Sequence, residues 1–248
     1  MNVIIHNWYL YLIPFLYGMM LLIEFISQYS RVAGYFINRN AIAYSLQNTT
    51  FTLTRFFSVL LMPLIGLMVD NAYTPSVFIA CVLLSFYFVA ILGCGVFFFR
   101  KSICNFYIRF ITNYVNGGGI FHSFFKSLSC NKNKKIKVDI SDIDNFIIDF
   151  KYFFIACFIY SIHATGIFMT FYFALISPIH KIMITQMSGV INAFATLLLT
   201  FKIDPALSVA IERRHDFISA FVSIFYARIF VFFVIAPAIF LLLYKVTA

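Results

Sequence analysis

Polar side chains recur along one face of a long apolar stretch at residues 41–69. They are separated by three or four positions and comprise Ser45, Asn48, Thr52 and Arg55. This spacing places side chains on the same side of a helix. Hydroxyls and amides donate and accept hydrogen bonds, and arginine presents planar donors that match a phosphate group. The face therefore predicts either a polar track that binds an anion or hydrogen bonds between packed helices.

Three further ionisable residues lie within or at the end of apolar stretches. Glu24 and Arg228 fall inside such stretches, and Asp70 follows the stretch that carries Arg55. A charge inside a bilayer is costly unless it is paired or lines a polar cavity. Glu24 could form a structural ion pair, or part of a binding site, with one of three arginines: Arg31, Arg55 and Arg228. The excess of guanidinium over carboxylate predicts a positively charged interior that suits an anion such as phosphate.

A third group of polar residues lies within an apolar stretch at 182–202. Gln186, Ser188 and Asn192 are more polar than helix packing requires, and such side chains can hydrogen-bond a sugar. The neighbouring stretch carries His163, which we predict either as a packed core histidine or as a cavity residue.

The elements that position these residues must be helices in lipid. The 248-residue chain is 62% hydrophobic and 11% charged, with a mean hydropathy of +0.94, whereas a soluble domain is about half apolar and a quarter charged. This composition excludes a soluble enzyme, a nucleic-acid-binding protein and a secreted disulfide scaffold. A bilayer core requires roughly 20 apolar residues per helix. Six stretches qualify: 7–29, 41–69, 76–99, 151–177, 182–202 and 217–244.

We therefore expect an all-α, polytopic membrane helix bundle that forms a single integral membrane domain over residues 1–248. Segments 30–40, 100–151 and 202–216 carry 2, 9 and 3 lysines and arginines, whereas the opposite side carries only Lys181 and Lys245. Because cytoplasmic loops are enriched in basic residues, both termini are expected outside. Within the basic segment 100–150, aromatic residues at helical spacing predict amphipathic helices in the membrane interface. A short cytoplasmic helix that leads into the last span is expected to begin at Asp204, with Asp204 as its N-cap and Pro205 at its first helical position.

The sequence contains no motif for ATP binding, nucleophilic hydrolysis or zinc binding. Asp139, Asp142 and Asp144 form its one cluster of acids, which we interpret as a solvated turn. We therefore expect no catalytic residue, no metal and no cofactor, and we expect a transporter rather than an enzyme. The expected partners are membrane lipids and an anionic lipid substrate.

Two stretches resemble the Amj family, the alternate lipid II flippases of bacteria. The first contains Glu24, Ser30-Arg31, Gly34, Thr54-Arg55, Pro63, Gly66 and Asp70. The second contains Gln186 through Asn192, Ala195-Thr196, Asp204-Pro205 and Ser208. The order and spacing of both, and the hydropathy profile between them, agree with the family.

The resemblance implies a multi-pass protein of the bacterial inner membrane that moves lipid II from the cytoplasmic to the outer leaflet. Lipid II is an undecaprenyl diphosphate that carries a disaccharide-pentapeptide. Its headgroup would pass through a polar cavity while the polyprenyl tail stays in lipid. Arg31 and Arg55 are expected to bind the diphosphate, and Glu24 to hold an arginine in place. The polar residues of 182–202 would then bind sugar.

Three other functions fit the same residues. The chain could translocate another polyprenyl-diphosphate-linked saccharide, such as a capsule or O-antigen precursor. It could be a membrane enzyme acting on polyprenyl lipids, which would require its clustered aspartates. It could also be a noncatalytic scaffold of envelope synthesis, which would tolerate the substitution Arg55→Gln.

Overall fold

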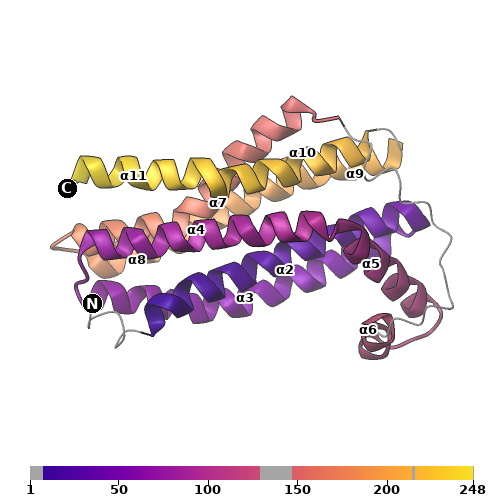
Figure 1. Ribbon diagram of the computed structural model, residues 1–248, viewed down its shortest axis with the longest axis horizontal. Helices are drawn as coiled ribbons and strands as arrows, with labels where there is room; N and C mark the ends of the chain where they lie inside the picture. Colours follow the sequence, from indigo (N-terminus) through magenta and orange to yellow (C-terminus); the bar gives the residue numbers. More distant parts are fainter. Residues whose placement is uncertain (1–7, 129–146, 214–215, 248) are drawn as a thin grey trace.

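The computed structural model describes residues 8–128, 147–213 and 216–247, and this part of the chain contains helices and no strand (Figure 1). The predicted all-α class is confirmed. In chain order the elements are α2 (Tyr9–Ile37), α3 (Asn40–Asp70), α4 (Pro75–Phe98), α5 (Arg100–Val115), α6 (Ile120–Leu128), α7 (Phe150–Ile176), α8 (Lys181–Leu198), η2 (Leu199–Ile203), α9 (Asp204–Arg213), α10 (Phe217–Phe230), η3 (Val231–Ile235) and α11 (Ala236–Thr247).

Six helical stretches of the described residues are long and apolar enough to cross a membrane: Leu10–Ile37, Asn40–Asp70, Pro75–Phe98, Phe150–Ile176, Lys181–Arg213 and Phe217–Thr247. They run along a common axis. The α2–α3 connection, α5, α6 and α9 gather at one end of the bundle, which we call the α5 end (Figure 1). The α3–α4 and α7–α8 connections and the last turn of α11 lie at the opposite end.

Helix α2 continues well past the end expected for the first span. The sequence predicts a first span of about 7–29 followed by a cytoplasmic segment 30–40, whereas α2 continues to Ile37. The segment remains helical because it packs against α3, where Ser30 Oγ donates a hydrogen bond of 2.9 Å to the carbonyl oxygen of Ala43. Asn38, with φ 56°, then adopts the left-handed conformation that ends the helix.

Two π-helical turns interrupt the last two long stretches, and each comes just before a proline. The backbone N–H of Asp204 donates to the carbonyl of Leu199, and Pro205 follows. In the same way the N–H of Ala236 donates to Val231, and a proline follows at 237. A proline ring clashes with the carbonyl four residues earlier in an α-helix, and the wider π-turn makes room for it.

The expected N-cap at Asp204 was therefore wrong. Its φ of −61° and ψ of −47° are helical, so α8, η2 and α9 form one continuous stretch. The fifth span was predicted to end at residue 202, whereas this stretch continues to Arg213.

Helices α5 and α6 form the described part of the basic segment 100–150. Helix α5 packs on α2 and on α6, and it buries Cys104, Tyr107, Ile108, Phe110 and Ile111. The amphipathic pattern of the sequence thus corresponds to a real helix. Its apolar side covers the α5 end of the bundle.

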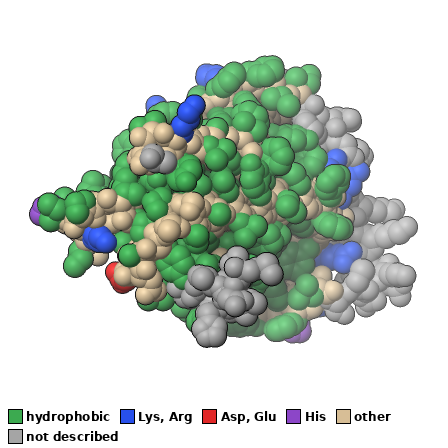
Figure 2. All heavy atoms as spheres, turned by 60° about the vertical axis from the view of Figure 1, so that its left-hand side comes forward, with side chains coloured by type: hydrophobic (Ala, Val, Ile, Leu, Met, Phe, Trp, Pro, Cys, Tyr) green, Lys and Arg blue, Asp and Glu red, His purple; other side chains and the backbone are tan. Residues whose placement is uncertain are grey.

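The outer surface of the bundle is apolar. Many large hydrophobic side chains are exposed on it, including Phe56, Val59, Ile91, Phe154 and Phe158. Figure 2 shows hydrophobic side chains over most of the visible face, with the few Lys and Arg side chains toward its margins. Such a surface is stable in contact with lipid.

Candidate substrate cavity

A cavity of about 340 Å³ lies between two helical pairs, and we call it the arginine cavity. Helix α3 packs on α2, and α8 packs on α7. As a result, α3 and the α8–η2–α9 stretch face each other across the cavity, and α2 and α10 form its back. Its polar lining comprises Glu24, Ser27, Gln28, Arg31, Gln47, Asn48, Thr52, Arg55, Thr196, Thr200, Asp204 and Arg228.

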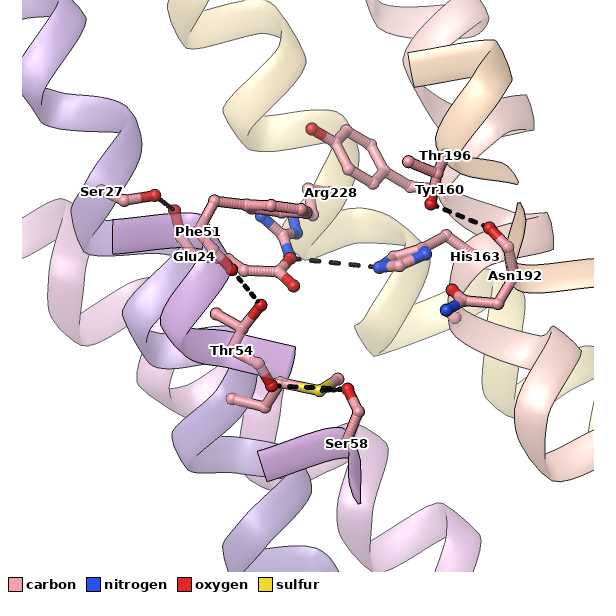
Figure 3. Close-up of polar contacts among 12 residues, drawn as sticks. Glu24, Ser27, Phe51, Thr54, Ser58, Tyr160, His163, Asn192, Thr196 and Arg228 are labelled. Carbon is pink, nitrogen blue, oxygen red and sulfur yellow. Dashed lines mark hydrogen bonds and ion pairs between the residues drawn. The ribbon is translucent and has the colours of Figure 1, made fainter. Parts of the chain in front are cut away.

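A buried ion pair lies at the back of this cavity. Nη2 of Arg228 donates to Oε2 of Glu24, and these residues are 1% and 5% exposed (Figure 3). The guanidinium also lies over two aromatic rings, 4.4 Å from the centroid of Phe25 and 5.0 Å from that of Tyr160. Of the three arginines that could pair with Glu24, the structure selects Arg228. Removing either partner would leave a lone charge away from water.

A second ion pair lies in the same cavity, closer to the α5 end. Nη2 of Arg31 is 2.7 Å from Oδ1 of Asp204, and the guanidinium lies 4.6 Å from the ring centroid of Tyr44. Arg31 was counted in the cytoplasmic segment 30–40, and its side chain is only 3% exposed. The resemblance pointed to Asp204 but not to this pairing. No local pattern reveals it, because 173 positions separate the two residues.

Arg55 differs from the other two arginines. It lies on α3, lines the cavity and is exposed. Within the described residues it makes no hydrogen bond and no ion pair. Thr52 and Asn48 line the cavity one and two turns away from Arg55 on the same face, as their spacing predicts, whereas Ser45 is exposed outside the lining.

The arginine cavity carries more donors than the protein satisfies. Nε and Nη1 of Arg31 and Nε of Arg228 are buried without a hydrogen-bond partner. Three arginines face two carboxylates there, so the charge of the lining is positive. Unsatisfied buried donors are costly. An anion with several oxygens would satisfy all of them.

A second cavity of about 490 Å³ opens at the opposite end of the bundle, between α3 and the start of α8. We call it the polar pocket. It is lined by Met62, Pro63, Gly66, Val69, Asp70, Phe171, Lys181, Ile182, Thr185, Gln186, Ser188 and Gly189. One aspartate balances one lysine in this lining. Amides and hydroxyls of this kind suit neutral hydrogen-bonding groups such as those of a sugar.

Two polar residues lie outside both linings, beside the buried ion pair. Nε2 of His163 is 4.0 Å from Oε2 of Glu24, and its Nδ1 is buried without a partner. The side-chain Oδ1 of Asn192 is also buried without a hydrogen-bond partner. The backbone carbonyl of Asn192 accepts a hydrogen bond of 2.8 Å from Thr196 Oγ1. Figure 3 shows His163 between Glu24 and Asn192.

The eight site residues expected from the sequence thus fall into three places. Glu24, Arg31, Arg55 and Arg228 lie in the arginine cavity, Asp70, Gln186 and Ser188 line the polar pocket, and Asn192 lies beside His163. Sequence reasoning missed the aromatic residues of the site. Tyr160 follows an aromatic-rich stretch and Tyr44 is an isolated aromatic residue near the start of an apolar span, so no local signal separates either from packing residues.

In the described ranges no three His, Cys, Asp or Glu residues lie together in a way that could hold a metal ion. The aspartate cluster at positions 139, 142 and 144 lies outside the described residues. Within the described residues the charged and polar side chains of the arginine cavity are arginines, carboxylates, amides and hydroxyls.

These features define a polytopic helical membrane protein with a positively charged internal cavity. Comparison with known families matches residues 16–216 to the family Amj, described as Alternate to MurJ. The match covers most of the chain, so the chain belongs to the Amj family. Comparison with curated proteins and with solved structures gave no match.

Proposed function

We propose that this chain is a flippase that moves lipid II from the cytoplasmic to the outer leaflet of the bacterial inner membrane. The family description, Alternate to MurJ, supports a role in lipid II translocation. In this proposal the chain acts as one integral membrane domain, without a catalytic residue. Its proposed substrate-binding residues lie in the arginine cavity, in the polar pocket and beside His163: Glu24, Arg31, Arg55, Arg228, Asp70, Gln186, Ser188 and Asn192.

The observation that carries the proposal is the set of free donors in the arginine cavity. Arg55 has no partner among the described residues, and Arg31 and Arg228 keep unsatisfied nitrogens. A diphosphate offers several charged oxygens, which arginine binds in bidentate fashion. The three guanidiniums come from α2, α3 and α10. In this proposal each of the three helices contributes one guanidinium to the diphosphate.

The position of the cavity suits a lipid rather than a free anion. Helices α3 and α8 face each other across it, and each packs on a different neighbour, α2 or α7. A headgroup can therefore enter between α3 and α8 while its polyprenyl tail stays in the surrounding lipid. A volume of about 340 Å³ is at the lower end of the roughly 300–1,000 Å³ typical of small-molecule sites. It holds the diphosphate and part of the first sugar, so passage of the whole headgroup requires α3 and α8 to separate.

The polar pocket supplies the second half of the route. It lies on the same two helices at the other end of the bundle, and its lining has equal numbers of acidic and basic side chains. Gln186 and Ser188 can hydrogen-bond sugar or peptide there, while Asp70 repels the diphosphate. We assign this pocket to release.

The orientation follows from the basic residues. Arg39, Arg100, Lys101, Arg109 and Lys126 are at the α5 end. By the positive-inside rule this end faces the cytoplasm, and both termini face outward. Lipid II is made on the cytoplasmic face, so it enters at the arginine cavity and leaves at the polar pocket.

Complementation tests the proposal in cells depleted of their main lipid II flippase. We expect this chain to restore growth together with lipid II in the outer leaflet, assayed directly. Arg55→Gln should fail, and Lys181→Gln, which removes one positive charge from the polar pocket, should retain most activity. Failure of the unmodified chain despite verified membrane insertion contradicts lipid II as the substrate. Capsule and O-antigen precursors are then tested in the same assay.

A further inference from the structure

The buried ion pair poses a problem for anion binding. Nη2 of Arg228 donates to Oε2 of Glu24, its Nε is buried without a hydrogen-bond partner, and the residue lines the arginine cavity. A diphosphate at that nitrogen would lie beside an ionised carboxylate in a region shielded from water. Two anions on one buried guanidinium repel each other strongly. The carboxylate must therefore lose its charge when the diphosphate binds.

The groups around Glu24 leave one candidate for that change. The charged or titratable groups that face it are Tyr17 on α2, Tyr160 and His163 on α7, and Arg228 on α10. From α3, Thr54 is uncharged, and its hydroxyl is bonded to its own helix. Asp204, the other carboxylate of the cavity, is bound to Arg31 and is 31% exposed. A proton that enters from the cavity can be accepted directly by the Glu24 carboxylate.

We propose that Glu24 is the binding site of a coupling proton, taken up when the diphosphate of the substrate binds to Arg228. This inference rests on the proposed function. The proton moves from water in the arginine cavity to a carboxylate oxygen of Glu24, and the Glu24–Arg228 ion pair is exchanged for an Arg228–diphosphate pair. Because linkage is reciprocal, protonation strengthens diphosphate binding by the same factor.

His163 marks the exit for that proton. Its Nε2 is 4.0 Å from Oε2 of Glu24, and its unpartnered Nδ1 lies on the side of Asn192. Ser188, one helical turn from Asn192 on α8, lines the polar pocket. These polar groups lie between the ion pair and the polar pocket. A proton taken up at the arginine cavity and released at the polar pocket moves outward together with the headgroup, so a pH gradient that is acidic on the side of the arginine cavity drives transport.

The test measures proton uptake during binding. Purified full-length protein in weakly buffered detergent receives farnesyl diphosphate as the probe, while a pH indicator and a binding assay run in parallel. We expect about one proton taken up per diphosphate, and an affinity that falls by up to about tenfold per pH unit as the pH rises. The probe's own ionisation acts with the opposite sign, because arginines prefer its more ionised form.

Glu24→Gln should bind the probe without proton uptake and with an affinity that no longer falls as pH rises. Glu212→Gln, the same change on an exposed position of α9, is the matched control and should behave as the unmodified chain. His163→Gln should keep the uptake but slow transport driven by a pH gradient in proteoliposomes.

Binding without proton uptake by the unmodified chain overturns the coupling and leaves the proposed function standing. Equal uptake by Glu24→Gln and the unmodified chain overturns the assignment to Glu24. If Glu24→Gln does not fold, the pH series on the unmodified chain tests the proposal. An affinity that does not fall as the pH rises contradicts it. Absence of any probe binding contradicts the proposed function itself, and the coupling falls with it.

Discussion

The arginine cavity and the polar pocket lie on the same two helices, α3 and α8, but they differ in charge. The arginine cavity is lined by three arginines and two carboxylates, and the polar pocket is lined by one lysine and one aspartate. The first also contains buried donors without partners. The proposed function assigns the anion to the first cavity, because the second has no excess of positive charge with which to retain it.

One face of α3 lines both cavities, and its residue types differ between the two ends. The face of α3 that begins at Asn48 and Arg55 in the arginine cavity continues through Met62 and Gly66 to Asp70 in the polar pocket. The residue types change along it from cationic to apolar to acidic. A headgroup that moves along this face leaves favourable charge and approaches unfavourable charge, which favours release.

The largest effect is expected from breaking the buried ion pair with Arg228→Met. Glu24 would then be a lone buried charge, which costs about 3–5 kcal/mol of stability. Thermal unfolding in detergent measures it, and transport should be lost. The double variant Glu24→Leu/Arg228→Met should recover most of the stability without recovering transport. Unchanged stability of Arg228→Met contradicts the burial of this pair.

A smaller effect on binding, with none on folding, is expected for Arg55→Gln. The side chain is exposed and unpartnered among the described residues, so stability should change by less than about 0.5 kcal/mol. Loss of its charged hydrogen bonds should weaken diphosphate binding by about 1.5–3 kcal/mol, or roughly 10- to 100-fold. Lys181→Gln removes the same charge from the polar pocket and should leave affinity nearly unchanged. Equal losses in both variants would erase the distinction between the two cavities.

The packing around α3 should also differ between its two ends, being tight at the α5 end and looser at the opposite end. A Cβ added at Gly34 would lie 2.3 Å from Ala43 Cβ, whereas one added at Gly66 would lie 3.9 Å from Phe171 Cε1. Gly34→Ala should therefore cost about 1–3 kcal/mol through overpacking, and Gly66→Ala should be tolerated. Thermal unfolding of the two variants checks this. A stable Gly34→Ala protein argues against the close approach of α2 and α3 at the α5 end.

The smallest expected effect is a gain. Asp204 competes with the substrate for Arg31, but it is partly exposed, so the ion pair contributes about 1 kcal/mol or less. Asp204→Asn should therefore raise diphosphate affinity by up to about fivefold and slow release. Titration of the probe measures the first effect, and transport rate the second. A loss of affinity would show that Asp204 positions Arg31 rather than competing for it.

The sequence predicts the helical class and the polar face of α3 because both depend on local periodicity. Asn48, Thr52 and Arg55 share a face at any helix position, whatever packs around them. Which arginine pairs with Glu24 depends instead on how distant helices meet, and spacing along one chain carries no such information. The burial of Arg31 was missed because this residue was counted among the basic residues that mark the cytoplasmic side of the membrane.

The continuous stretch from α8 to α9 was missed for a different physical reason. Asp204-Pro205 is a strong helix-start signal in isolation. In this protein the π-turn before it, Leu199–Ile203, accommodates the proline within the helix. The same device recurs before Pro237. The division of Gln186 and Ser188 from the arginines likewise depends on tertiary structure, since only the bundle shows that they lie at opposite ends.

Site-specific photocrosslinking tests the central claim most directly, that the arginine cavity holds the diphosphate headgroup of lipid II. A photoreactive amino acid replaces Asn48, which lines the cavity, in cells that accumulate lipid II. The matched control replaces Leu241, which is exposed on the apolar surface of α11. The account predicts a crosslink to lipid II at position 48 that Arg55→Gln reduces, and none to its headgroup at position 241. Equal labelling at both positions, or none at position 48, would contradict it.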